Sequence, residues 1–175
     1  STTPARLRNR PGDAVAGAPV VDGGIRSPAL WMRFDEGLFS QDDFTRENVK
    51  GSKCAIRGAD SYWRRGVSGT CLSFDGYTNR VTVPARELPD IRGEFTIEAW
   101  IAVHAYPWGW CPISARRDAK QAGFFFGVDA RGRLGLHART SSGWQECNSE
   151  RTVPLMKWTH VAGTRDSAGL TVYIG

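Results

Sequence analysis

The residues best suited to hold a ligand are two tryptophans separated by a glycine in the segment Tyr106–Trp110 (YPWGW). A segment that contains Pro and Gly is typical of a loop, so burial of both indoles is not automatic. An exposed indole can stack on the flat apolar face of a sugar ring while neighbouring polar side chains bind the hydroxyl groups. Trp144–Glu146 (WQE) occupies a similar position after a predicted hairpin. These aromatic residues predict carbohydrate as the ligand.

The polar partners of these indoles are expected on the strands between the two tryptophan segments. The candidate ligand-binding residues are Trp108, Trp110, Arg116, Arg117, Asp118, His137, Arg139, Trp144 and Glu146. Trp63, Trp100 and Trp158 are interpreted as residues that pack in the core or against strands, and Trp110 is also compatible with a core position.

The carboxylates do not form the pair that glycoside hydrolysis needs. A retaining mechanism requires two carboxyl groups about 5 Å apart, which alternate acidic residues on one strand could supply. Glu98 instead has Thr96 and Trp100 as its neighbours on the same face of a predicted strand. No Ser-His-Asp signature, phosphate-binding loop or zinc spacing is present. We therefore expect this chain itself to be non-catalytic.

The four cysteines are Cys54, Cys71, Cys111 and Cys147, and an even number in a Trp-rich chain favours disulfides in a secreted or periplasmic protein. Three connectivities are possible. The preferred one pairs Cys54 with Cys71, because we expect their segments to be adjacent and antiparallel. Cys111 and Cys147 would then pair and tie the tryptophan loop to the Trp144 segment.

The net charge of +5 comes mainly from arginine, since lysine occurs only at positions 50, 53, 120 and 157. Arginine can bind carboxylate, sulfate or phosphate, but here it is scattered among 18 acidic residues. No basic stripe indicates nucleic-acid binding, and no apolar run reaches the roughly 20 residues of a membrane-spanning helix. Residues 1–28 lack periodicity and are interpreted as an extended basic, Pro- and Gly-containing arm. The absence of a leader before Ser1 is consistent with a signal peptide already removed.

From Ala29 onward the pattern is that of short strands. Phe95–Val103 alternates apolar and polar residues, and Phe124–Val128 and Arg133–Arg139 form a hairpin around Asp129–Gly132. Further strands are predicted at 30–34, 71–74, 81–83, 112–116, 158–164 and 170–174, and no long helix is expected. Hairpin-linked, half-buried strands predict an all-β, two-sheet antiparallel sandwich.

The order of these segments resembles the laminin-G-like jelly roll of the concanavalin A-like lectin/glucanase superfamily from about Ala29 to the C-terminus. The matching segments are Ala29–Gly37, Cys71–Gly76, Val81–Pro84, Phe95–Trp100, Pro112–Asp118, Gly132–Leu134, Val153–Gly163 and Leu170–Ile174. Members of this family continue beyond the last segment with further strands. The resemblance therefore implies a sandwich that lacks its last strands, with a further chain or domain to complete it.

The resemblance implies a non-catalytic carbohydrate-recognition module of a larger secreted protein. Two alternatives stay open: an extracellular protein-binding adhesion module, and a fragment of a glycoside hydrolase whose catalytic acids lie outside this chain. The family also implies a structural Ca²⁺, for which Asp35, Asp43 and Asn48 are the candidate ligands, since Ca²⁺ takes several oxygen ligands.

Overall fold

The computed structural model describes residues 27–58, 62–116, 123–140 and 143–175, and its elements in these ranges are strands with one short 3₁₀ helix. The strands are β1 (Phe44–Arg46), β2 (Lys53–Arg57), β3 (Tyr62–Arg65), β4 (Thr70–Ser73), β5 (Arg80–Thr82), β6 (Phe95–Ala102), β7 (Cys111–Arg116), β8 (Phe124–Val128), β9 (Arg133–Thr140), β10 (Gly143–Thr152), β11 (Trp158–Asp166) and β12 (Gly169–Ile174). The 3₁₀ helix η1 is Ala85–Glu87.

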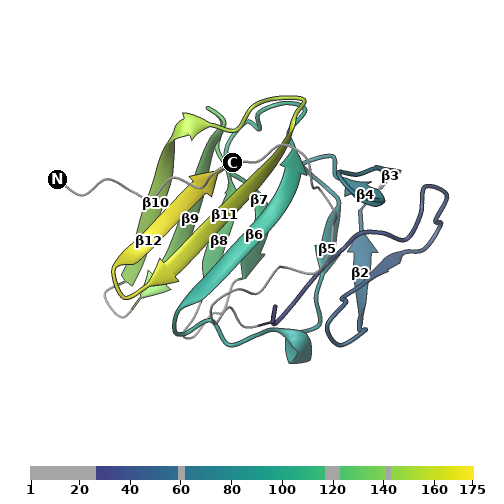
Figure 1. The fold of residues 1–175 in the computed structure, drawn as a ribbon, viewed down its shortest axis with the longest axis horizontal. Coiled ribbons are helices and arrows are strands. Elements are labelled where there is room, and N and C mark those ends of the chain that lie inside the picture. Colours follow the sequence, from purple (N-terminus) through teal and green to yellow (C-terminus); the bar gives the residue numbers. More distant parts are fainter. Residues whose placement is uncertain (1–26, 59–61, 117–122, 141–142) are drawn as a thin grey trace.

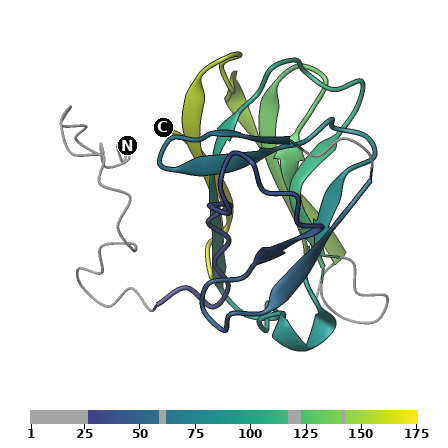
Figure 2. The same cartoon turned by 90° about the vertical axis from the view of Figure 1, so that its right-hand side faces the viewer.

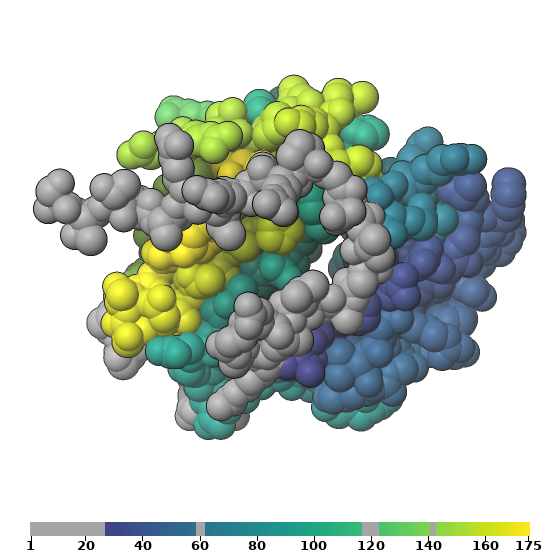
Figure 3. Space-filling model, in the orientation of Figure 1, coloured from purple at the N-terminus to yellow at the C-terminus, as the bar shows by residue number. Residues whose placement is uncertain are grey.

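Two antiparallel sheets form the sandwich (Figures 1 and 2). One sheet has four strands in the order β10-β9-β8-β7, and the other has three in the order β12-β11-β6. Beside them lie the small sheet β1-β2-β5 and the hairpin β3-β4, which are blue in the space-filling view of Figure 3. The predicted all-β antiparallel sandwich is confirmed.

The core lies between the two large sheets because their strands alternate apolar and polar residues. Its fully enclosed members come from both layers: Phe126, Val128, Leu134, Leu136, Val153 and Val161. Ile97, Ala99 and Ile101 of β6 pack against them from the other sheet, whereas Glu98 and Trp100 point outward. The alternation read from the sequence of β6 is therefore the one that the structure has.

The β8–β9 turn is fixed by one carboxylate. Asp129 Oδ1 accepts hydrogen bonds from the backbone N–H groups of Arg131 and Arg133, each at 2.8 Å, and Oδ2 pairs with the Arg133 guanidinium at 2.7 Å. Burial alone raises the pKa of Asp129, but the hydrogen bonds from Arg133 and Arg131 hold it below the ordinary value. This turn sets the register of the hairpin.

The strand predicted at 30–34 is wrong. In the structure this segment makes a single bridge, Met32 to Glu47, and Phe34 has a left-handed backbone with φ of 56°. Its N–H groups are bound by side chains instead of by a neighbouring strand: Trp31 N donates to Glu47 Oε1 at 3.0 Å, and Arg33 N donates to Asn48 Oδ1 at 3.1 Å. Buried acceptors of this kind leave no alternation in the sequence to detect.

The predicted arm at residues 1–28 lies almost wholly outside the described residues. The other strands are found with small changes in their ends, and β1, β2 and β3 are additional strands that the pattern did not reveal. No helix in the described residues is long and apolar enough to cross a membrane.

Candidate functional site

The outward side of the four-stranded sheet carries the densest group of aromatic and polar side chains among the predicted site residues. On β9, the buried Leu134, Leu136 and Ala138 alternate with outward-pointing residues, and the register places outward residues of β8 and β10 beside them. We call this group the outer face; with the ring that covers it, it comprises Trp110, Phe125, His137, Arg139, Trp144, Glu146 and Asn148. It points away from the viewer in Figure 1.

The cross-strand register arranges the outer face in rows. Phe125, His137 and Glu146 lie opposite one another across β8, β9 and β10, and form the middle row. Arg139 lies opposite Trp144 in the next row. Five residues from separate strands and turns are therefore brought to one surface by pairing alone.

Trp110 covers the other end of the outer face, next to the middle row. Its ring contacts His137 edge to face, with 4.7 Å between centroids, and Phe125 at 5.6 Å. It lies over Gly135, where an added Cβ would come within 2.5 Å of the indole. The indole remains 40% exposed. A glycine on β9 therefore makes the space that lets an aromatic ring lie on the sheet.

His137 links the aromatic and polar parts of the outer face. Its Nε2 lies 3.3 Å from Asn148 Oδ1, a distance at which the Nε2–H tautomer donates to the amide oxygen. Its Nδ1 lies 3.9 Å from Glu146 Oε1. The side chain of His137 is largely buried and that of Glu146 is mostly exposed. His137 is thus held in place, while Glu146 presents its carboxylate to solvent.

Trp144 is the more accessible indole of the outer face, with 55% of its surface exposed. Its ring reaches across the sheet towards Gly123, where a Cβ would lie 3.3 Å from the indole. Gly123 O accepts a hydrogen bond from Arg139 N at 3.0 Å, so the ring extends over the backbone around Arg139. An open aromatic surface and an exposed guanidinium are neighbours here.

The structure therefore brings together five of the predicted ligand-binding residues: Trp110, His137, Arg139, Trp144 and Glu146. Arg116 is turned away, because its guanidinium donates to Pro89 O at 2.6 Å. Trp108 is 92% exposed in the loop before β7, and no described contact joins it to the outer face. Arg117 and Asp118 lie outside the described residues.

Two members of the outer face were missed by the sequence analysis. Phe125 belongs to an unbroken run of phenylalanines, in which only the alternation of β8 separates the outward ring from its buried neighbours. Asn148 continues the alternation that begins at Trp144 and Glu146, and this spacing was the signal that could have identified it.

The predicted disulfides are wrong: all four cysteines are free thiols in the structure. Cys111 is on β7 and Cys147 on β10, with β8 and β9 between them, so their Cα atoms are separated by at least about 14 Å. A disulfide needs less than about 7 Å. Cys54 on β2 pairs with β1 and β5, whereas Cys71 on β4 pairs with β3, so these strands are not the adjacent pair that was expected.

The three predicted calcium ligands have protein partners in the structure. Asp35 Oδ1 accepts from Thr70 N at 3.0 Å, Asn48 Oδ1 accepts from Arg33 N, and Asp43 lies 4.0 Å from the Arg57 guanidinium. The described residues contain no group of three or more His, Cys, Asp or Glu side chains that could hold a metal ion. The side chains as placed do not fit a Ca²⁺ site, and the metal remains a prediction from the family resemblance.

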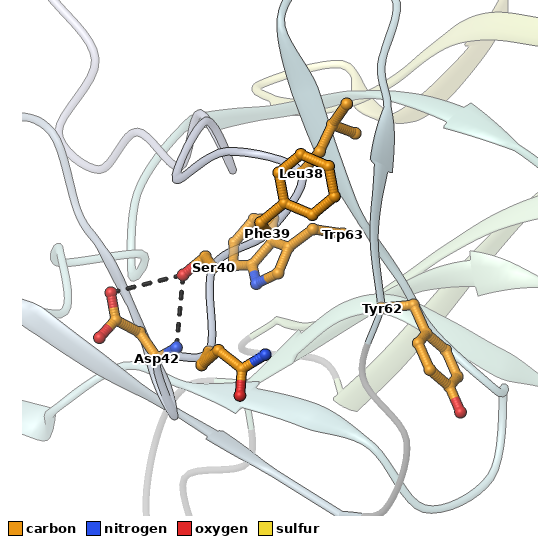
Figure 4. A pocket seen from close by; sticks show the side chains of 7 residues that line it. Leu38, Phe39, Ser40, Asp42, Tyr62 and Trp63 are labelled. Carbon is orange, nitrogen blue, oxygen red and sulfur yellow. Dashed lines mark hydrogen bonds between the residues drawn. The ribbon is translucent and has the colours of Figure 1, made fainter.

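A shallow pocket lies away from the outer face, between the loop before β1 and the hairpin strand β3 (Figure 4). Its lining residues are Leu38, Phe39, Ser40, Gln41, Asp42, Tyr62 and Trp63. Ser40 and Asp42 hydrogen-bond to each other across its rim, at 3.4 Å between Oγ and Oδ2. The pocket offers an apolar surface with no second titratable group beside Asp42.

Comparison with solved structures finds a similar fold in a crystal structure titled as an S-layer domain-containing protein (residues 221–444) from Clostridium thermocellum. The TM-score is 0.54 at 22% sequence identity, and the match covers 83% of this chain and 67% of that one. At this identity the likeness shows the fold alone. No curated protein matches the chain.

Comparison with protein families gives a direct match. The family model described as the concanavalin A-like lectin/glucanases superfamily matches residues 75–175, which include every strand of the two large sheets. This match and the antiparallel sandwich agree with the resemblance seen in the sequence. The chain therefore belongs to the concanavalin A-like lectin/glucanases superfamily.

Proposed function

We propose that this chain is a carbohydrate-recognition module that binds its glycan on the outer face of the β10-β9-β8-β7 sheet. Family membership supports a lectin or binding module in general. The observation that carries the proposal is the grouping of two partly exposed indoles, Trp110 and Trp144, with polar side chains on one flat surface.

The chemistry of the outer face suits a sugar ring. Indoles stack on the apolar C–H faces of sugars, and Glu146, Asn148 and Arg139 offer acceptors and donors for hydroxyl groups within the same rows. Trp110 and His137 hold each other in a fixed orientation, so little conformational entropy is lost when the ligand binds. Arg139 and Gly135, over which Trp110 lies, are four residues apart on β9, about 13 Å, which is room for more than one ring.

The test is binding of the purified chain to a glycan array, followed by calorimetric titration of the best-binding oligosaccharide. Trp144→Ala and Trp110→Ala are each expected to weaken binding by about 1–3 kcal/mol, the range for loss of an aromatic anchor. Trp100→Ala is the matched control, because Trp100 is 53% exposed but lies on the other sheet. Trp108→Ala tests whether the loop tryptophan also contacts the ligand.

Two results would contradict the proposal. One is the absence of saccharide binding by a folded chain, which would favour the alternative of a protein-binding adhesion module. The other is an equal loss of affinity in Trp100→Ala and Trp144→Ala, which would show that the ligand does not distinguish the two faces.

We also infer that the chain belongs to an extracellular protein. The family membership and the surface-layer title of the structural neighbour support this location, whereas the predicted disulfides, being absent, do not. Labelling of intact cells with a membrane-impermeant reagent is expected to modify the native protein; protection until lysis would contradict the inference.

A further inference from the structure

The end of the outer face around Trp144 has a property that a site for neutral sugars does not need. Arg139 lies directly opposite Trp144 in the β9–β10 pair, so their Cβ atoms are about 5 Å apart on the same side of the sheet. The indole extends over the backbone towards Gly123, and the Arg139 side chain is exposed beside it. A guanidinium therefore stands at the edge of the most accessible aromatic surface.

The charge of Arg139 is not neutralised within the part of the chain that the structure describes. No carboxylate there lies within ion-pair distance of its guanidinium, whereas Arg133 on the same strand pairs with Asp129 at 2.7 Å. Glu146, the acidic residue of the outer face, lies opposite His137 instead and contacts its imidazole. Arg165 adds a second cation, since its Nη1 donates to Arg139 O at 3.2 Å. This end of the outer face is positive.

Arginine beside an indole is suited to a sugar ring that carries an anion. The guanidinium presents two parallel N–H donors, which match the oxygen atoms of a carboxylate or a sulfate. The indole fixes the plane of the ring, so an anionic substituent at the ring edge would be directed at Arg139. A neutral ring would use the indole but leave the guanidinium hydrated.

We propose that the outer face binds an acidic saccharide, a polymer of uronic acid or a sulfate ester, whose anionic group pairs with Arg139 while its ring stacks on Trp144. This inference rests on the proposed function and deepens it by naming the class of glycan. The Glu146–His137 end would then hold neutral rings through their hydroxyl groups, since a carboxylate there repels a second anion.

The experiment compares polymers that share a backbone and differ in charge. One pair is polygalacturonate and its fully methyl-esterified form, and the other is dextran sulfate and dextran. At low ionic strength, calorimetric titration is expected to show at least about tenfold tighter binding of one or both anionic polymers than of the neutral partner. The polygalacturonate pair reports on carboxylates and the dextran pair on sulfates.

Two variants separate the specific contact from general attraction. Arg139→Gln is expected to remove the preference for the anionic polymer and to leave the affinity for the neutral one unchanged. Arg139→Lys keeps the charge without the planar fork and should restore only part of the preference. Arg80→Gln is the control, because it removes the same charge from β5, in a different sheet.

Equal affinity for the charged and neutral members of both pairs would overturn the acidic-saccharide inference and leave the proposed carbohydrate site intact. An equal effect of Arg80→Gln and Arg139→Gln would also overturn it, because binding would then depend on net charge alone. Absence of binding to every saccharide, with the chain folded, would overturn the proposed function itself.

Discussion

The indole of Trp110 and the imidazole of His137 meet edge to face, with an angle of 77° between their planes. This contact exists because Gly135 has no side chain under the indole. One glycine on β9 thus fixes the aromatic part of the outer face, and the first prediction concerns this position.

Gly135→Ala is expected to displace Trp110, because a Cβ at this position would lie 2.5 Å from the ring. The cost is on the order of 1–3 kcal/mol of stability, the range for overpacking, together with weaker glycan binding. Near-ultraviolet circular dichroism and tryptophan fluorescence measure the displacement. Gly109→Ala is the matched control, since a Cβ at Gly109 meets no atom within 4 Å. Unchanged spectra in Gly135→Ala would contradict the placement of Trp110.

The four cysteines are expected to react as thiols without prior reduction. In denaturant, alkylation of the unreduced protein should modify all four, and a reductant should leave the melting temperature unchanged. In the native state Cys54 should react last, because it is fully buried and burial raises the pKa of its thiol. Recovery of fewer than four modified thiols from the denatured, unreduced protein would show that a disulfide forms after all.

Stability is expected to fall on acidification through the titration of Asp129 and Glu47. Burial alone raises the pKa of each carboxyl, but hydrogen bonds hold both below their ordinary values of 3.8 and 4.5. A lowered pKa in the folded state stabilises the protein above the unfolded-state value, and this contribution is lost as the pH falls through the folded value. Chemical denaturation should therefore show a loss of stability beginning below about pH 4.5.

Asp129→Asn tests this explanation at one residue. The variant cannot form the ion pair with Arg133, and we expect a loss of about 2 kcal/mol at neutral pH, on the scale of hydrogen bonds to a charged group. Its stability should also depend less on pH below 4.5 than that of the unmodified chain. Asp166→Asn, in the β11–β12 turn, is a useful comparison because Asp166 is exposed and its carboxylate accepts only backbone hydrogen bonds. An identical pH dependence in the Asp129 variant would assign the acid sensitivity to other groups.

Calcium is expected to leave the melting temperature unchanged, because Asp35, Asp43 and Asn48 already have protein partners. Differential scanning calorimetry with excess Ca²⁺ and with EGTA measures this directly. A higher melting temperature in Ca²⁺ that disappears in Asp35→Asn would instead support the metal site implied by the family resemblance.

The sequence predicts the two large sheets well because their strands carry strong alternation. β6, the β8–β9 hairpin and the β11–β12 hairpin each show apolar residues at every second position or a turn residue at the right place. The strand predicted at 30–34 failed because its backbone donors go to Glu47 and Asn48, and side-chain acceptors leave no periodic signal.

The candidate site was predicted residue by residue but for a partly mistaken reason. The sequence analysis relied on a Cys111–Cys147 disulfide to bring the tryptophan segments together, whereas the structure does this through strand register and through Trp110 lying over Gly135. Register between strands that are distant in sequence depends on how whole sheets pack, which single residues do not reveal.

The pairing of β6 with β11 also has a consequence for how the chain is made. Thr96 pairs with Thr164 and Trp100 with His160, whereas β7, β8, β9 and β10 lie between these strands in sequence and pair as hairpins with one another. During synthesis the hairpins can form as they emerge, but β6 must wait for β11 with its apolar side uncovered. Nascent chains arrested before residue 158 should therefore engage chaperones through the segment Phe95–Ala102, and release should coincide with the appearance of β11.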